Sequence, residues 1–316
     1  MGAFIVRRLI ALVPLLLLIS FAVFALVLVI PGDPARTLAG GTHADPAKVV
    51  QIRHQLHLDQ PLVKQYWRWL SHAVRGNLGT SIYPATHTVS QEIAHRFPIT
   101  LSLTLAAMVV SLIIGIPGGI LAGLKPGSAR DRSVTFGTSL GIAMPDFWVA
   151  MILVVLFAVK THLLPAIGYV GISQDPAGWL RDMALPCIAL GLAGGATIAR
   201  QLRGSLIDAM DQDYIRTARA MGLRRRTIIG KYALKNAATP VLTLVGLQFA
   251  YLLGGTFIIE QIFSIPGMGS YMLGAIQLKD LPKVQGVVLV TAVIFVVVNL
   301  VVDVGYGFLS PKVRVS

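Results

Sequence analysis

Charged side chains are scarce in this chain. Only 13% of its 316 residues are Asp, Glu, Lys or Arg, whereas a typical soluble domain carries about 25%. Hydrophobic residues make up 55%, and they gather in runs long enough to cross a bilayer. The composition therefore excludes an ordinary soluble protein and indicates a polytopic membrane protein.

Cysteine and nucleotide-binding motifs are also lacking. The one cysteine, Cys187, lies in an apolar run and is interpreted as a small core residue, because no intrachain disulfide can form. The phosphate-binding motif G-x-x-x-x-G-K-[ST] does not occur. Gly119, Gly123 and Lys125 come near it but have the wrong spacing. No nucleophile–base pair has a spacing that fixes a site. We expect this chain to bind no cofactor itself and not to be an enzyme.

Acidic residues are outnumbered, and the net charge is +13. The basic residues lie between and beside the apolar runs. Anionic lipid headgroups and acidic partner surfaces are therefore the expected counter-charges, and a nucleic acid partner is not expected.

Six apolar runs predict an all-α membrane protein with six transmembrane helices. Their approximate bounds are 9–30, 99–124, 134–159, 184–198, 241–259 and 284–309. The first run follows Arg7-Arg8 and exceeds the core of a signal peptide, so it is predicted to be a retained helix. Lys and Arg are concentrated in the predicted inner loops, which places both termini in the cytoplasm.

The longest polar region separates the first two runs. Residues 31–97 predict an external helical subdomain, between residues 1–30 and a membrane-embedded core at 98–316. All seven histidines fall on the predicted outer side. His54 and His57 are one helical turn apart, but no Cys or carboxylate cluster joins them, so no metal site is predicted.

Residues 208–240 form the one long basic stretch in the second half of the chain. Its basic residues are Arg216, Arg219, Arg224, Arg225, Arg226, Lys231 and Lys235. Each would cost about 2.5–3.5 kcal/mol at the bilayer centre, so the stretch must lie in water or against a partner. Asp211 is predicted to cap a short helix that ends at a left-handed Gly222, and a second basic helix is predicted at 224–236.

These residues resemble the EAA loop of ABC-importer permeases, most closely the loop of dipeptide, oligopeptide and nickel permeases. The likeness rests on Arg216-Thr217-Ala218, Gly222, residues 233–237 and Pro240. Arg216 and Thr217 depart from the general motif but agree with its peptide-permease variant. Residues 31–34, 76–81 and 265–269 extend the resemblance over nearly the whole chain.

The resemblance implies a type I ABC importer permease in a bacterial plasma (inner) membrane. Its loop would be the coupling helix that docks on an ATPase. The docking residues would be Tyr214, Ile215, Arg216, Thr217, Ala218, Arg219, Ala220, Met221, Gly222 and Leu223. The implied partners are a second, homologous permease, two ATPases or one fused ATPase that hold ATP and Mg, an extracytoplasmic substrate-binding protein, and membrane lipids. Without the resemblance, the stretch fits an ordinary basic cytoplasmic loop equally well.

The implied cargo is a di- or oligopeptide, and nickel complexes, metallophores and haem remain alternatives. Polar residues inside the runs are candidates for the pathway or its gate, with a structural role as the alternative at each position. They are Asp146, Gln248, Glu260, Asn299 and Asp303. A stand-alone ion-coupled secondary transporter or channel is the competing class. It predicts activity without an ATPase, together with inverted repeats that the sequence does not display.

Overall fold

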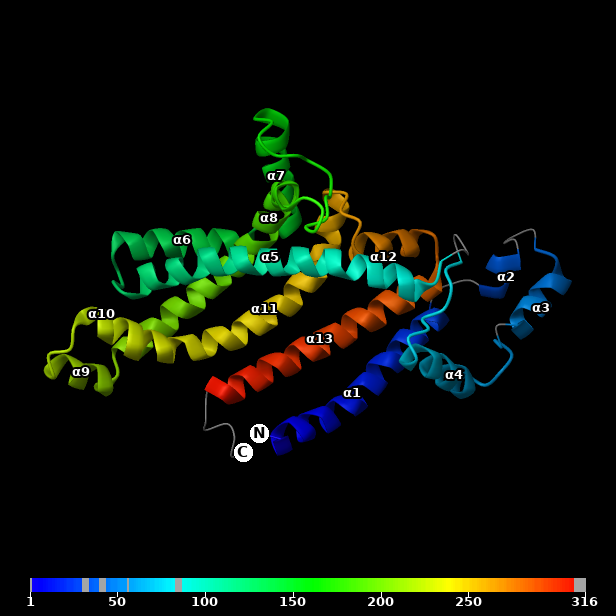
Figure 1. Cartoon of the computed structure of the whole chain (residues 1–316), viewed down its shortest axis with the longest axis horizontal. Helices are drawn as coiled ribbons and strands as arrows, with labels where there is room; N and C mark the ends of the chain where they lie inside the picture. The colour runs from blue at the N-terminus through cyan, green and yellow to red at the C-terminus, as the bar shows by residue number, and fades with distance from the viewer. Residues whose placement is uncertain (1, 30–33, 40–43, 56, 83–86, 310–316) are drawn as a thin grey trace. The chain divides into compact units, whose positions relative to one another are not determined.

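A computed structural model describes residues 2–29, 34–39, 44–55, 57–82 and 87–309 (Figure 1). The described residues are helical almost throughout. They also contain an isolated β-bridge between Thr80 and Thr88. The predicted all-α class is thereby confirmed. The chain divides into two compact units: residues 1–5, 97–270 and 295–316 form the first, and residues 6–96 and 271–294 form the second.

Among the described residues, four helices are long and apolar enough to cross a bilayer. They are α5 (Val89–Gly123), α8 (Pro176–Met210), α11 (Leu234–Ile262) extended back to Arg225, and the described part of α13 (Leu281–Leu309). A fifth span results if α6 (Ala129–Ala143) and α7 (Asp146–Leu153) with its continuation η2 (Val154–Lys160) count as one. The apolar part of α1 (Gly2–Val29) is shorter, at Ile10–Ala25. The count of six spans stays a prediction.

The core of the first unit is built around α8. This helix runs beside α11 (Figure 1) and is the most buried of the candidate spans. Small residues allow close approach: a Cβ at Gly191 would lie 2.7 Å from Val110 Cγ1, and one at Gly115 would lie 2.7 Å from Ile198 Cβ. Close packing through small residues is typical of helices in membranes, where apolar burial alone does not hold helices together.

The prediction of a short fourth span was wrong, because α8 has 35 residues. Hydropathy measures only the part of a helix that fits the lipid, and α8 continues through Arg200 and Arg203 with regular backbone bonding. The third run is broken at Pro145-Asp146, where α6 and α7 meet at 102°. Proline at 145 lacks the amide that would continue the helix.

The second unit holds α1 to α4, the start of α5, most of α12 (Met268–Gln277) and the first half of α13. Helices α2 (Pro34–Ala39), α3 (Pro46–Gln55) and α4 (Leu62–Val74) fall in the region predicted to be a helical subdomain. Tyr66 of α4 fixes α4 to α1, because its hydroxyl lies 2.8 Å from Ser20 Oγ and its ring packs edge-on against Phe21. A buried polar group with such a partner avoids the cost of desolvation.

Candidate functional site

The predicted docking stretch forms a short helix between two long ones. Helix α9 (Asp213–Ala220) follows the end of α8, and α10 (Arg225–Thr227) begins the return towards α11. We call residues 211–224 the knob. Gly222 has φ +72°, which confirms the predicted left-handed end of the helix, and its amide donates to the Arg219 carbonyl at 3.0 Å. Glycine adopts this backbone conformation without the Cβ clash that other residues meet.

Two predictions about this stretch were wrong in detail. The N-cap of α9 is Gln212, without a side-chain bond, and Asp211 instead ends α8. The predicted second helix at 224–236 is not separate, because α10 passes through the π-helical segment η3 (Ile228–Ala233) directly into α11. The knob is therefore joined to a candidate span on both sides.

One face of α9 holds the knob in place. Ile215 is 0% exposed and Ala218 is 4% exposed. Both belong to an apolar cluster with Leu206 of α8 and Ala237 of α11. A displacement of α9 would have to break this packing or carry the ends of both long helices with it.

The opposite face of the knob is open. Of the predicted docking residues, Leu223 is half-buried and the exposed ones are Tyr214, Arg216, Thr217, Arg219, Ala220, Met221 and Gly222. The rest of the knob is exposed too, at Asp211, Gln212, Asp213 and Arg224. The docking surface predicted from the resemblance stays a prediction, and within it Ile215 and Ala218 serve as packing residues.

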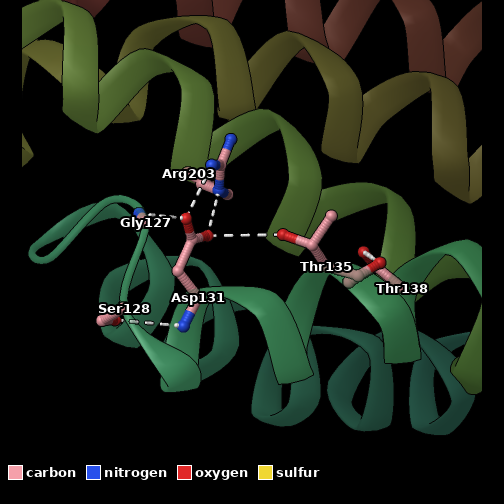
Figure 2. A network of polar contacts seen from close by, with 6 residues as sticks. All are labelled: Gly127, Ser128, Asp131, Thr135, Thr138 and Arg203. Atoms are coloured by element: carbon pink, nitrogen blue, oxygen red, sulfur yellow. Dashed lines mark hydrogen bonds and ion pairs between the residues drawn. The ribbon is translucent and has the colours of Figure 1, made fainter.

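A buried ion pair ties α8 to the start of α6 near the knob (Figure 2). Asp131, only 4% exposed, accepts two bonds from the Arg203 guanidinium, of which the Nη2–Oδ2 bond measures 2.9 Å. It also accepts from the Gly127 amide at 2.8 Å and from Thr135 Oγ1 at 3.3 Å. A buried carboxylate needs this many partners, because desolvating it alone is costly.

The sequence interpretation missed Asp131, although a signal was present. Ser128-Ala129-Arg130-Asp131 has the S-x-x-D spacing of a helix start. Ser128 is indeed the N-cap of α6 and accepts from the Asp131 amide. The partner Arg203 could not be predicted, because it lies 72 residues away on another helix.

Glu260 is an anchor within the first unit. Its side chain is 0% exposed, Thr100 Oγ1 donates to its Oε1, and the amides of Gly269 and Ser270 donate to Oε2 at 2.7 and 3.0 Å. Those amides belong to the first turn of α12, where a negative charge is stabilised. Of the two roles weighed for Glu260, the geometry favours the structural one.

Among the described residues, the other pathway candidates contact different neighbours. Gln248 is 9% exposed and packs over Gly194 of α8, where a Cβ would lie 2.8 Å from its Nε2. Asn299 donates to the carbonyl of Phe295 one turn earlier at 2.9 Å. Asp303 lies in α13, but its side chain falls outside the described residues. Asp146 begins α7 and accepts from the hydroxyl of Tyr251 at 3.3 Å.

Polar groups of the second unit differ in their partners, since the buried Tyr271 hydroxyl has no hydrogen-bond partner among the described residues. His54 Nδ1 lies 2.9 Å from Asp59 Oδ2. Within the part of the chain that the structure describes, no group of three His, Cys, Asp or Glu could hold a metal. Burial and the nearby Glu92 carboxylate raise the pKa of Tyr271 to about 12, so this phenol stays neutral at physiological pH.

Several long apolar helices, with a basic knob joined to two of them, define a polytopic membrane protein. Residues 115–315 match the family described as "Binding-protein-dependent transport system inner membrane component", and residues 1–104 match the N-terminal model of such membrane components. The chain belongs to this family. It is the membrane-spanning permease component of a transport system, and the family resemblance predicted from the sequence is confirmed.

Named relatives match along nearly their whole length. A putative peptide transport system permease protein of Brucella abortus (strain 2308) is 40% identical, with 99% of each chain covered. A probable peptide ABC transporter permease of Sinorhizobium fredii is 36% identical, over 99% of this chain and 100% of the relative. The glutathione transport system permease protein GsiC of Escherichia coli (strain K12) is 39% identical, with 98% of each covered.

Solved structures share the fold at low identity. A chain from an inward-facing structure of the MetNI methionine ABC transporter matches with a TM-score of 0.57 and 17% identity, covering 69% of this chain and 96% of that one. A second crystal form of the same transporter gives a TM-score of 0.54 and 19% identity, covering 70% and 97%. This likeness confirms the permease fold.

Proposed function

We propose that this permease forms half of the translocation pathway of an ATP-driven importer of di- or oligopeptides. The observation that carries the proposal is the full-length similarity to permeases named for peptides and for glutathione, itself a peptide. The family description implies a substrate-binding protein as a partner. In the proposed assembly the other half is a second, homologous permease, and ATP and Mg are bound by separate ATPase subunits.

The knob is the proposed contact with the ATPases. Its exposed arginines Arg219 and Arg224 offer charge to an acidic groove, as does Arg216, which also contacts Asp213 Oδ1 at 3.2 Å. Its exposed Met221 offers apolar area. This assignment places the knob and both termini in the cytoplasm. ATP-dependent closure of the ATPases would favour one position of α9 over another, and the apolar cluster around Ile215 and Ala218 would carry that preference to α8 and α11.

Purification and reconstitution test this proposal. The tagged permease is purified in mild detergent from its native membrane, and the bound subunits are identified by mass spectrometry. The complex is then placed in proteoliposomes with its binding protein, and uptake of dipeptides, longer peptides, glutathione, nickel and haem is measured with and without ATP.

The expected result is a bound ATPase, a second permease and ATP-dependent uptake of peptides. Uptake of nickel or haem alone would show that the cargo is not a peptide, while the proposed ATP-driven assembly would stand. Ion-driven uptake by the permease without any ATPase would contradict the proposal and favour a secondary transporter.

A further inference from the structure

One carboxylate at membrane level differs from the other buried ones in its surroundings. Asp131 is bound by an arginine, Asp280 by a lysine and a serine hydroxyl, and Glu260 is enclosed by a hydroxyl and two amides. Asp146 is half-buried, and among the described residues Tyr251 is the side chain that donates to it, at 3.3 Å. Asp146 therefore retains accepting capacity for a further donor.

The helices that carry this pair are candidate membrane spans by length and composition. Helix α6 has 15 residues, with Arg130 in its first turn and its end just before the break at Asp146, which is about 22 Å of helix. Tyr251 lies in the apolar part of α11, beyond Pro240. A carboxylate at this depth costs roughly 2.5–3.5 kcal/mol if it faces lipid, so it is expected to face an aqueous path or a partner.

The surface around the pair is open. Tyr251 is 57% exposed and shares a stripe of α11 with Leu247, 57% exposed, and Ile258, 53% exposed. A Cβ at Gly254 would meet nothing within 4 Å, and one at Gly255 would lie 3.7 Å from Asp146 Oδ2. The absence of side chains at these two glycines leaves an approach to the carboxylate along α11.

The chemistry of the pair suits a small cation. An ionised carboxylate accepts a charge-assisted bond from an ammonium group, and the face of a tyrosine ring attracts the same charge. The apolar cavity of about 450 Å³ elsewhere in this unit lacks a carboxylate, since Met108, Val245 and Phe249 line it together with other apolar residues and a glycine. A cationic group in the pathway would therefore bind at Asp146.

We propose that Asp146 and Tyr251 form a transient site for the protonated amino terminus of the peptide as it crosses the membrane. The inference rests on the proposed function, because it requires peptide cargo. Asp146 would hold the ammonium group directly, and Tyr251 would orient the carboxylate and present its ring.

The test compares a free and a blocked amino terminus in the complete reconstituted complex. Uptake of alanyl-alanine and of N-acetyl-alanyl-alanine is measured at concentrations that saturate the binding protein. Wild type is compared with Asp146→Asn, which keeps an acceptor at the start of α7, and with Tyr251→Phe, which keeps the ring. Asp45→Asn is the matched control, because Asp45 is an exposed carboxylate that caps α3 and asparagine caps equally well. The binding protein is the same throughout, so its own preference cancels between variants.

Asp146→Asn is expected to lower the preference for the free amine about tenfold and Tyr251→Phe about twofold, with Asp45→Asn unchanged. A second measurement uses a dipeptide with a diazirine in its first residue, which should label residues 144–151 or 247–255 in wild type and less in Asp146→Asn. Equal loss of uptake for both peptides, or labelling elsewhere only, would overturn the inference and leave a structural role. If wild type moves neither peptide, the proposed function itself fails, and the inference fails with it.

Discussion

Arg203 of α8 donates through two guanidinium nitrogens to Asp131 of α6, so the helix that leads to the knob is fastened to α6 by a partly buried ion pair. Asp131 is 6% exposed at its side chain and Arg203 is 32% exposed. Arg203 lies one turn before Leu206 in α8, and Leu206 belongs to the apolar cluster under α9. Any force that the knob receives therefore reaches a helix already fixed at this point.

Asp131→Asn is expected to destabilise the permease, because Arg203 keeps its charge and loses its counter-charge. Breaking a fully buried pair costs about 3–5 kcal/mol, and the partial exposure of Arg203 reduces this to about 2 kcal/mol. Arg203→Lys should cost less but still lose the two-point geometry. Thermal unfolding in detergent, followed by tryptophan fluorescence, measures both. Arg200→Lys is the control, since Arg200 makes only a long 3.4 Å contact to Ser139. Equal melting temperatures in Asp131→Asn and wild type would count against the fastening role.

Gly222→Val is expected to separate ATP hydrolysis from transport. Valine at φ +72° is strained by about 1–3 kcal/mol, so the end of α9 should shift and the docking surface with it. Gly222→Asn should retain more transport, because asparagine tolerates the left-handed region. The measurement is peptide uptake per ATP hydrolysed in proteoliposomes. Gly230→Ala, at an exposed position with open space around it, is the control. If Gly222→Val takes up as much peptide per ATP hydrolysed as wild type, the knob is not the docking contact.

Much of this molecule was predictable from its sequence. The apolar runs indicate the long helices, Pro145 indicates the break between α6 and α7, and Gly222 indicates the end of α9. These are local features, since proline removes an amide and glycine permits positive φ.

The errors and omissions have other physical causes. Helix α8 continues past its apolar run through Arg203, whose partner Asp131 is distant in the sequence. Glu260 was weighed as a gate, but the amides that bind it become neighbours only when α12 folds back onto the end of α11. The openness of Asp146 depends likewise on which side chains of α11 surround it.

Ile215→Ala and Met221→Ala are expected to separate packing from docking in the knob. Ile215 is fully buried, so its truncation should cost about 2–4 kcal/mol of stability. Met221 is 73% exposed, so its truncation should leave unfolding unchanged and weaken binding of the ATPase several-fold. Unfolding temperature and pull-down of the ATPase are measured on the same samples. If Met221→Ala binds the ATPase as well as wild type, Met221 is not part of the contact, and another part of the knob must make it.

Glu260→Gln is expected to loosen the start of α12. The glutamine retains one acceptor oxygen but loses the charge that the Gly269 and Ser270 amides favour, at a cost of about 1–3 kcal/mol. A methyl at Gly267 would overlap the same carboxylate, so Gly267→Ala should act in the same direction. Hydrogen exchange of residues 264–272 measures the loosening directly.

Glu92→Gln provides a matched control for Glu260→Gln. Glu92 pairs with Arg96 within one helix, in a partly exposed setting where such pairs contribute little. Its substitution should leave exchange at 264–272 unchanged. Glu260 acting as a gate would give a different pattern, because exchange would stay at the wild-type level while uptake changed. Faster exchange at residues 264–272 in Glu260→Gln and in Gly267→Ala would instead mean that the carboxylate works by holding α12 in place.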